Sequence, residues 1–393
     1  MAATEARAPF GNYQYEIYLK GLAGETPAFP IGWADLEARA SAAMDAGANG
    51  YVFGSAGTED TEHENRAAFG RHRIVPRMLR DVSTRDLRTE ILGVAHDAPV
   101  LLAPIGVQTI VHPDGELAAA RGAAAGGIGF VASTASAYTM EEIAAAGGDV
   151  PHFYQLYWPR DQELTASFVS RAESAGYGAL IVTLDTGLLA WRPRDLQAAY
   201  LPFLKSVGIA NYLSDPVFRS ALAQPPEDNP TAAVMHFVSV FSNPAVNWDD
   251  LATLRSLTSL PILLKGILHP DDARLALDHG VEGIVVSNHG GRQVDGAIAA
   301  LDALPDVVDA VGDDLVVLFD SGVRSGADVV KALALGARAV LLGRPYLWGM
   351  AIGGADGVHQ VIRNLLSEID LTLALSGHAS LSTLDRGMLR SRW

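Results

Sequence analysis

Cysteine is absent from the sequence of 393 residues. The chain therefore cannot form a disulfide, a thiolate metal site or a cysteine nucleophile. Basic residues are in the minority: 29 Lys and Arg stand against 45 Asp and Glu, a formal net charge of −16. This balance argues against nucleic acid and anionic membranes as partners, because each needs a basic face to replace its counterions. A small anionic substrate stays compatible with it where a few arginines converge.

Long apolar runs are also missing. The most apolar stretches, such as residues 178–184, have the length of a strand, whereas a membrane span needs roughly 18–20 residues. Residues 1–15 contain no cationic segment followed by an apolar run, so we expect no signal peptide and a cytoplasmic location. HExxH, Walker A and GxSxG motifs are absent, and the 11 histidines show no metal spacing. We therefore predict no metal site.

Short apolar runs alternate with Ala-rich amphipathic segments from residue 99 onward. Eight such strands predict a parallel sheet covered on both faces, and eight is the number that closes a (β/α)8, or TIM, barrel. An open doubly wound sheet is the alternative, weakened because no GxGxxG motif follows an early strand. The predicted strands are 99–104, 129–134, 152–158, 179–186, 261–266, 283–290, 316–322 and 339–344. The predicted helices are 115–126, 140–146, 161–176, 270–280, 301–311 and 325–336.

The predicted α/β chain forms one domain, residues 1–393, with a helical lead-in over 1–98 and the barrel over 99–393. One connection is unusually long. Residues 187–260 carry no strand pattern and are rich in Pro, Asn and Asp. The segment follows strand four, on the face where barrel enzymes carry their active sites. We predict a long lid-like loop, with a subunit contact or an inert insertion as the alternatives.

Polar residues stand at the C-terminal ends of the last five predicted strands, where a barrel places its site residues. They predict an active site rather than isolated structural hydrogen bonds. Gln155 and Tyr157 share one face of the third strand by period-two spacing. The strand ends carry Thr183 and Asp185, Lys265, SNHGGRQ at 287–293, DSGVRSG at 320–326, and Gly343 with Arg344.

Two of these clusters predict specific chemistry. The glycines and arginines after strands seven and eight are typical of a phosphate site. His289 and Arg292 pair a titratable base with a guanidinium that can hold a carboxylate, and Asp185 can orient the imidazole. Lys265 ends an apolar run and is compatible with either a Schiff base or the stabilisation of negative charge on a cofactor. The residues alone leave both open.

Several motifs, in order, carry a resemblance to a known family: LLAPIGVQ, HPDGE, YQLYW, VTLDT, SNHGGRQ, FDSGVRSG with LLGRP, and LALSG. Together they resemble the FMN-dependent 2-hydroxy acid oxidases and dehydrogenases, over about residues 51–377. Within that family, TLDTGLLAWRPRDL and YLPFLKSVGIANYLSDPVF are most similar to lactate 2-monooxygenases. The resemblance implies FMN as cofactor and an (S)-2-hydroxy acid, above all L-lactate, as substrate. It also implies a homo-tetramer or homo-octamer.

The resemblance further implies a catalytic role for His289, which would take the α-proton or the hydroxyl proton of the substrate. Asp185 would stabilise the resulting imidazolium. Tyr157 would hydrogen-bond the substrate hydroxyl or the forming carbonyl. Lys265 would lie at the flavin N1–C2=O edge and stabilise the anionic reduced flavin, which favours charge stabilisation over a Schiff base.

Binding roles follow from the same resemblance. Arg292 and Tyr51 would hold the substrate carboxylate, with Arg192 as a second arginine. The remaining residues implied in FMN binding are Pro104, Ile105, Gly106, Ser133, Gln155, Thr183, Ser287, Asp320, Gly322, Arg324, Gly343 and Arg344.

Two positions depart from the family pattern. Ala135 stands where glycolate-oxidising members have tryptophan, which leaves room for lactate or a larger aryl hydroxy acid. Gly187 and Leu188 replace a Pro-Arg pair that is found in many members of the family. No haem domain precedes the barrel, so we expect O2 as the acceptor.

The predicted reaction is that of a lactate 2-monooxygenase, in which a closed lid keeps pyruvate and hydrogen peroxide together until they give acetate, CO2 and water. One alternative is an oxidase that releases the 2-oxo acid and H2O2, with lactate or a mandelate-like acid as substrate. A non-redox Schiff-base barrel lyase is an alternative of another class, and an FMN-binding barrel without catalysis is a third.

Overall fold

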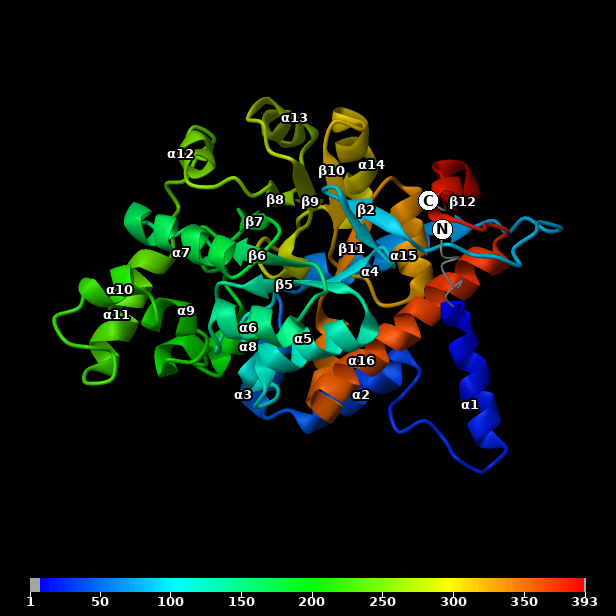
Figure 1. The fold of residues 1–393 in the computed structure, drawn as a ribbon, viewed down its shortest axis with the longest axis horizontal. Helices are drawn as coiled ribbons and strands as arrows, with labels where there is room; N and C mark the ends of the chain where they lie inside the picture. The colour runs from blue at the N-terminus through cyan, green and yellow to red at the C-terminus, as the bar shows by residue number, and fades with distance from the viewer. Residues whose placement is uncertain (1–7, 392–393) are drawn as a thin grey trace, which may run out of the picture.

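The computed structural model describes residues 8–391, and its centre is a closed barrel of eight parallel strands (Figure 1). The predicted TIM barrel is confirmed, and each predicted strand overlaps one of the eight. Neighbours around the barrel follow the order β10-β11-β4-β5-β6-β7-β8-β9. The strands are β4 (Val100–Leu102), β5 (Gly129–Ser133), β6 (His152–Leu156), β7 (Leu180–Thr183), β8 (Ile262–Ile267), β9 (Gly283–Val286), β10 (Val316–Phe319) and β11 (Ala339–Leu342).

Alternate residues of each strand face the barrel interior and the surrounding helices, as strand geometry requires. One apolar cluster fills the interior, with Leu101, Val131, Ile181 and Leu263 among its members. Ile91 belongs to the same cluster. It comes from the hairpin β2 (Thr89–Ile91) and β3 (Val94–His96), so this hairpin packs on the barrel's interior core.

The six predicted helices around the barrel are confirmed within a few residues of their predicted ends. Side-chain caps explain several starts: Thr139 with Glu142, and Ser325 with Asp328, form reciprocal capping boxes. The helices are α5 (Gly115–Gly126), α6 (Met140–Gly147), α7 (Gln162–Ser174), α13 (Pro270–Asp278), α14 (Ala300–Val311) and α15 (Gly326–Ala334). The sequence analysis assigned no helix after the last strand, where α16 (Arg344–Leu375) runs with a kink at Gly353 and Gly354.

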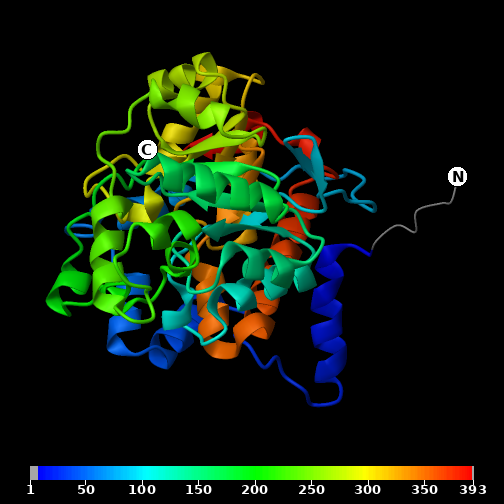
Figure 2. The ribbon, with the colours of Figure 1, turned by 60° about the vertical axis from the view of Figure 1, so that its left-hand side comes forward.

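Over residues 8–98, the lead-in holds four α-helices and also three short strands. After its helices, β1 (His72–Ile74) pairs antiparallel with β12 (Leu389–Ser391), which joins the lead-in to the C-terminal segment. Figure 2 shows α1 standing beside the body of the molecule. We expect no signal peptide in residues 1–15, and residues 1–7 of that stretch lie outside the described residues. The helices are α1 (Tyr13–Gly21), α2 (Trp33–Ala43), α3 (Ala46–Phe53) and α4 (Asp60–Arg71).

The segment 187–260 is not the long loop that the sequence analysis predicted, because it folds into helices with their own packed rings. The Tyr212 ring lies 4.9 Å from Phe237 and 5.6 Å from Phe218. The helices are α8 (Pro193–Gln197), α9 (Ala210–Leu213), α10 (Pro216–Ser220), α11 (Pro230–Phe241) and α12 (Asp250–Ser256).

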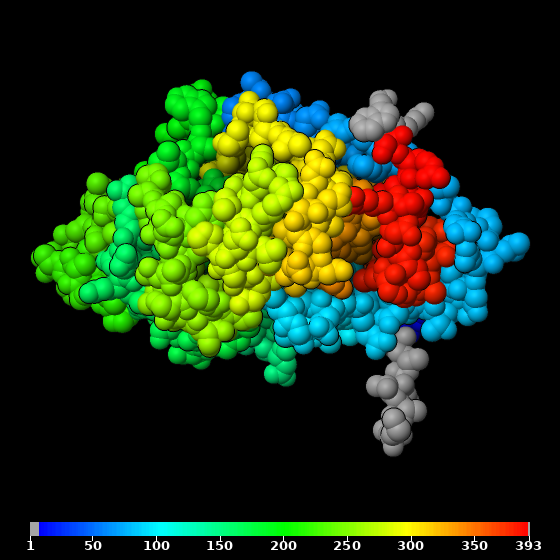
Figure 3. Space-filling model, turned by 90° about the horizontal axis from the view of Figure 1, so that it is seen from above, coloured from blue at the N-terminus to red at the C-terminus, as the bar shows by residue number. Residues whose placement is uncertain are grey.

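Proline opens three of these helices, a position where its missing N–H has no cost. Three of the prolines in the segment that was predicted to be a loop, Pro193, Pro216 and Pro230, are therefore helix starts. Figure 3 shows this region and the C-terminal segment at opposite ends of the molecule.

Across residues 8–391, no helix has both the length and the apolarity to cross a membrane. Within the same range, no three His, Asp or Glu side chains form a group that could hold a metal ion.

Candidate active site

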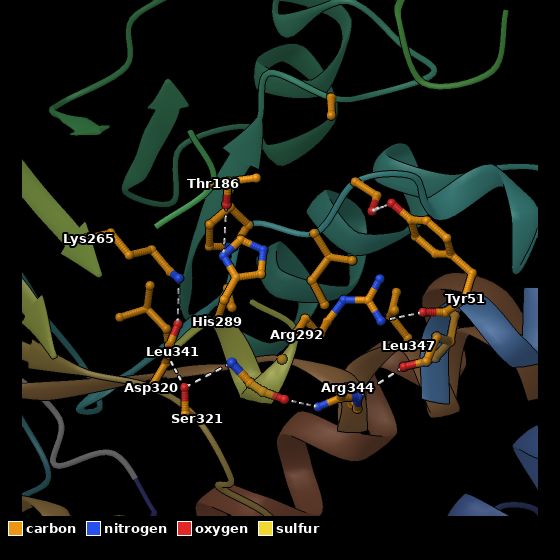
Figure 4. A pocket seen from close by; sticks show the side chains of 18 of the residues that line it. Tyr51, Thr186, Lys265, His289, Arg292, Asp320, Ser321, Leu341, Arg344 and Leu347 are labelled. Carbon is orange, nitrogen blue, oxygen red and sulfur yellow. Dashed lines mark hydrogen bonds and ion pairs between the residues drawn. The ribbon is translucent and has the colours of Figure 1, made fainter. Parts of the chain in front are cut away.

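A cavity opens at the C-terminal ends of the barrel strands, with about 1120 Å³ of empty space, part of it open to solvent. Residues after seven of the barrel strands line it, together with Tyr51 from α3 and Leu189, Arg192, Phe203 and Phe241 from the segment after β7. That segment therefore borders the site, as the sequence analysis expected. Figure 4 shows His289 between Lys265 on one side and Arg292 on the other.

His289 and Asp185 form a close pair. Asp185 follows β7 and His289 follows β9, and the Asp185 Oδ1 lies 2.7 Å from His289 Nδ1. Burial lowers the pKa of His289 and outweighs the opposing effect of Asp185. Burial alone would raise the pKa of Asp185, but the charges of His289 and Lys265 outweigh it and lower that pKa to about 2. At neutral pH the pair is therefore a neutral imidazole beside a carboxylate, the state that a general base requires.

The two members of this pair border different cavities. His289 lines the cavity described above, whereas Asp185 lines a second cavity together with Asn243, Trp248 and Asp272. Among the described residues, Asp185 Oδ2 has no hydrogen-bond partner although it is buried. The pair thus lies in the wall between the two cavities.

A left-handed turn presents His289, whose φ is +59°. The Ser287 Oγ accepts a hydrogen bond from the His289 backbone N–H at 3.0 Å. Asn288 and Asn65 of α4 exchange two hydrogen bonds of 2.8 Å through their side-chain amides. A Cβ on Gly291 would lie 2.6 Å from a backbone nitrogen of α4, so glycine is required there for the helix to approach the turn.

Two arginines face the cavity close to His289. The Arg292 Nη1 donates to the carbonyls of Tyr51 at 2.6 Å and Gly54 at 2.5 Å, and its guanidinium lies 4.9 Å from the centre of the Tyr51 ring. Arg192 is 6% exposed. Burial first, and then the charge of Arg292, lower the pKa of Arg192 to about 10. The buried Arg192 and the half-buried Arg292, which both line the cavity, favour an anion beside them.

Tyr157 and Ala135 line the same cavity. Burial raises the pKa of Tyr157, so its hydroxyl stays protonated and can donate a hydrogen bond. The Tyr51 hydroxyl donates to the Gly106 carbonyl at 3.1 Å. The small side chain of Ala135 stands close to Gly106, since a Cβ on Gly106 would lie 2.6 Å from the Ala135 Cβ.

Lys265 is buried and paired. Its Nζ lies 3.2 Å from Asp320 Oδ2 and donates to Ser287 Oγ at 2.9 Å. Burial would lower the pKa of Lys265, but the charges of Asp320 and Asp185 outweigh it and raise that pKa. A protonated amine is not a nucleophile, which argues against the Schiff-base alternative.

Ser133, Gln155 and Thr183 do not line this cavity. They form a buried chain across three adjacent strand ends, in which Gln155 Oε1 accepts from Ser133 Oγ at 3.0 Å and Gln155 Nε2 donates to Thr183 Oγ1 at 3.0 Å. Gln155 faces Ser133 in the sheet register, and Thr183 faces Lys265. The chain is therefore continuous with the strand ends that border the cavity.

The end of the cavity near β10 and β11 is cationic. Gly322, Arg324, Gly343 and Arg344 all line it. Burial, followed by neighbouring arginines, lowers the pKa of Arg324 to about 10 and that of Arg344 to about 9. An anion such as a phosphate would relieve this buried charge.

Comparisons with known proteins point to one family. The profile of the family described as FMN-dependent dehydrogenase matches residues 40–391. The chain belongs to this family. It is an FMN-dependent 2-hydroxy acid oxidoreductase, and several relatives align with it over most of both chains.

An L-lactate oxidase of Lysinibacillus sphaericus is 42% identical over 369 residues, which cover 94% of this chain and 95% of that protein. An FMN-dependent alpha-hydroxy acid dehydrogenase of Schizosaccharomyces pombe is 45% identical over 390 residues, 97% of this chain and 96% of that one. A crystal structure of mandelate oxidase aligns with a TM-score of 0.82 and 38% identity, and covers 92% of this chain and 98% of its own.

The cavity fits FMN, the cofactor of this family. Its cationic end suits the phosphate, and its walls at Pro104, Ile105 and Gly106 are largely apolar. Four of the residues predicted to contact FMN do not line the cavity: Ser133, Gln155, Thr183 and Ser287. Ser287 accepts a hydrogen bond from Lys265, which does line it. Gln155 is hydrogen-bonded to both Ser133 and Thr183.

Three residues of the site carried no predicted role. Asn288 and Gln293 stand inside the SNHGGRQ motif, where only the motif itself was a signal. Asn65 lies 223 residues from its partner Asn288 along the chain, and no signal in the sequence singled it out.

Proposed function

We propose that the chain is a 2-hydroxy acid oxidase, which converts L-lactate or a hydroxy acid with a larger apolar side chain, together with O2, into the 2-oxo acid and H2O2. The observation that carries this proposal is the shared cavity of His289 and Arg292. A neutral, Asp185-paired base and a carboxylate-binding guanidinium face the same space. A 2-hydroxy acid has a carboxylate that the guanidinium can bind and a proton that the base can take.

His289 takes one proton from the substrate, and Asp185 stabilises the imidazolium that forms. Arg292 and Arg192 hold the carboxylate, and Tyr157 donates to the oxygen that becomes the carbonyl. Lys265 and the residues of the cationic end would hold FMN, which would supply the two-electron transfer from substrate to O2. Each turnover consumes one 2-hydroxy acid and one O2 and yields one 2-oxo acid and one H2O2.

The fate of the peroxide separates the oxidase from the monooxygenase predicted from the sequence. The relatives reported above are named as an oxidase and a dehydrogenase, and the aligned structure is a mandelate oxidase. These names support the oxidase. Ala135 in the cavity wall supports a substrate range that extends beyond lactate.

Aerobic turnover of L-lactate, with pyruvate, peroxide, acetate and CO2 all quantified, tests the proposal. We expect pyruvate and peroxide in a 1:1 ratio, with little acetate. Acetate with little free peroxide would overturn the oxidase in favour of the monooxygenase. If L-lactate is not oxidised, (S)-mandelate turnover decides between a bulkier substrate and an FMN barrel without this activity.

A further inference from the structure

Gln293, the residue that follows Arg292, joins three groups of the segment after β7. Its Oε1 accepts a hydrogen bond from Arg192 Nη2 at 2.6 Å. Its Nε2 donates to the carbonyl of Asp185 at 2.5 Å and to that of Leu188 at 3.1 Å. The side-chain amide of Gln293 thus connects the backbone of Asp185 and Leu188 to the guanidinium of Arg192.

Arg192 depends on such contacts for its position. It is a buried cation beside another cation, Arg292, and it comes from a stretch between β7 and α8 with no regular secondary structure. Its Nε donates to the Arg292 carbonyl at 3.0 Å. Within residues 8–391, no acceptor is recorded for the Arg192 Nη1. That nitrogen is free to bind an anion in the cavity that Arg192 lines.

The orientation of Gln293 follows from its partners. The amide nitrogen must face the two backbone carbonyls, which only accept, and the oxygen must face the guanidinium, which only donates. A leucine would occupy a similar volume and make none of these bonds. The turn from Asp185 to Leu188 and the guanidinium of Arg192 would then lose their common partner.

We propose that Gln293 is a positioning residue that orients Arg192 toward the carboxylate of the substrate. The proposal rests on the proposed function, because it requires a substrate carboxylate beside Arg192. Gln293 itself is not in the cavity lining and acts through Arg192. Its loss therefore weakens the binding of the substrate and of the 2-oxo acid product, and leaves FMN binding unchanged.

The test uses the purified FMN-loaded enzyme and pyruvate as the probe. Pyruvate Kd is measured from the change in flavin absorbance, without turnover, for Gln293→Leu, Arg192→Leu and the double variant. Because Gln293 accepts a hydrogen bond from a charged group, we expect Gln293→Leu to raise the pyruvate Kd about 10- to 100-fold. The KM for L-lactate should rise by a similar factor, with kcat reduced less than about 3-fold.

Two further variants separate positioning from general destabilisation. Gln197→Leu, an exposed glutamine on α8, is the matched control and should leave the pyruvate Kd unchanged. Gln293→Glu keeps the size and the acceptor for Arg192 but turns an oxygen toward the carbonyls of Asp185 and Leu188. It should also weaken pyruvate binding, and FMN content should match the parent in all variants. Should Gln293→Leu fail to retain FMN, Gln293→Glu supplies the measurement.

The double variant gives the decisive outcome. If Gln293 acts through Arg192, the double variant binds pyruvate no more weakly than Arg192→Leu alone. Additive losses would overturn the proposal. Weak binding in Arg192→Leu with parental binding in both Gln293 variants would overturn it while leaving the carboxylate site intact. Parental binding in Arg192→Leu would overturn both the proposal and the role of Arg192 in the proposed function.

Discussion

Replacing Asp185 by asparagine removes the charge that faces His289 while keeping the size of the side chain. The carboxylate lies 2.7 Å from the imidazole Nδ1, and it lines the second cavity rather than the one that His289 borders. The substitution therefore affects the imidazolium formed during proton transfer, and not the substrate directly. We expect the rate of substrate oxidation to fall with little change in substrate binding.

The size of this effect follows from the electrostatics of the pair. Two unit charges about 4 Å apart at an effective dielectric constant of about 20 interact by about 4 kcal/mol. Asparagine keeps a neutral hydrogen bond, which is about half as strong as a charge-assisted one, so the net loss is about 2–4 kcal/mol. At 1.36 kcal/mol per factor of ten, oxidation slows about 30- to 1000-fold.

Anaerobic mixing with L-lactate measures this step, because the loss of flavin absorbance follows substrate oxidation alone. Asp272→Asn is the control, since Asp272 lines the same second cavity as Asp185 and makes no contact with His289. It should react within about 2-fold of the parent. An Asp185→Asn enzyme that reacts within about 3-fold of the parent would show that the carboxylate does not stabilise the imidazolium.

Three other predictions follow from the site. Because burial lowers the pKa of His289 from 6.5 and the base must be unprotonated, kcat/KM should be flat at neutral pH and should fall only below pH 6.5; a decline that begins above this value would contradict the neutral buried base. Lys265→Met leaves the Asp320 carboxylate buried without its cation, so urea unfolding should show a loss of about 3–5 kcal/mol, whereas parental stability would mean that Asp320 is solvated. Arg324→Leu removes a cation from the cationic end of the cavity, so fluorescence titration should show FMN binding weakened by about 10-fold or more, and an unchanged Kd would place the phosphate elsewhere.

The barrel was predictable because its strands are buried on both faces, and such strands are apolar at nearly every position. Polar residues then stand out where a strand ends: Asp185 after β7 and His289 after β9 needed only this contrast and the barrel rule to be placed at one site. Family resemblance, rather than spacing, supplied the role of Arg192. Its chain segment carries no periodic pattern that predicts a direction for the side chain.

The residues that orient the site were harder to find, because their partners are distant or are backbone atoms. Asn65 contacts Asn288 from a helix of the lead-in, and nothing local to either residue signals the other. Gln293 binds two backbone carbonyls, which have no sequence signature. Short helices after β7 were hidden because the prolines at their first turns also suit a loop.

The wall between the two cavities gives the enzyme a control point that is separate from substrate recognition. Asp185 lines the second cavity together with Asn243 and Trp248, in a space with about 1120 Å³ of empty volume, partly open to solvent. Substitutions of Asn243 or Trp248 change the polarity around Asp185, and through it the basicity of His289, without altering the residues that bind the hydroxy acid. The pH range of such an enzyme can therefore be changed through residues of the second cavity. Its substrate preference can be changed independently, through residues of the cavity that His289 lines.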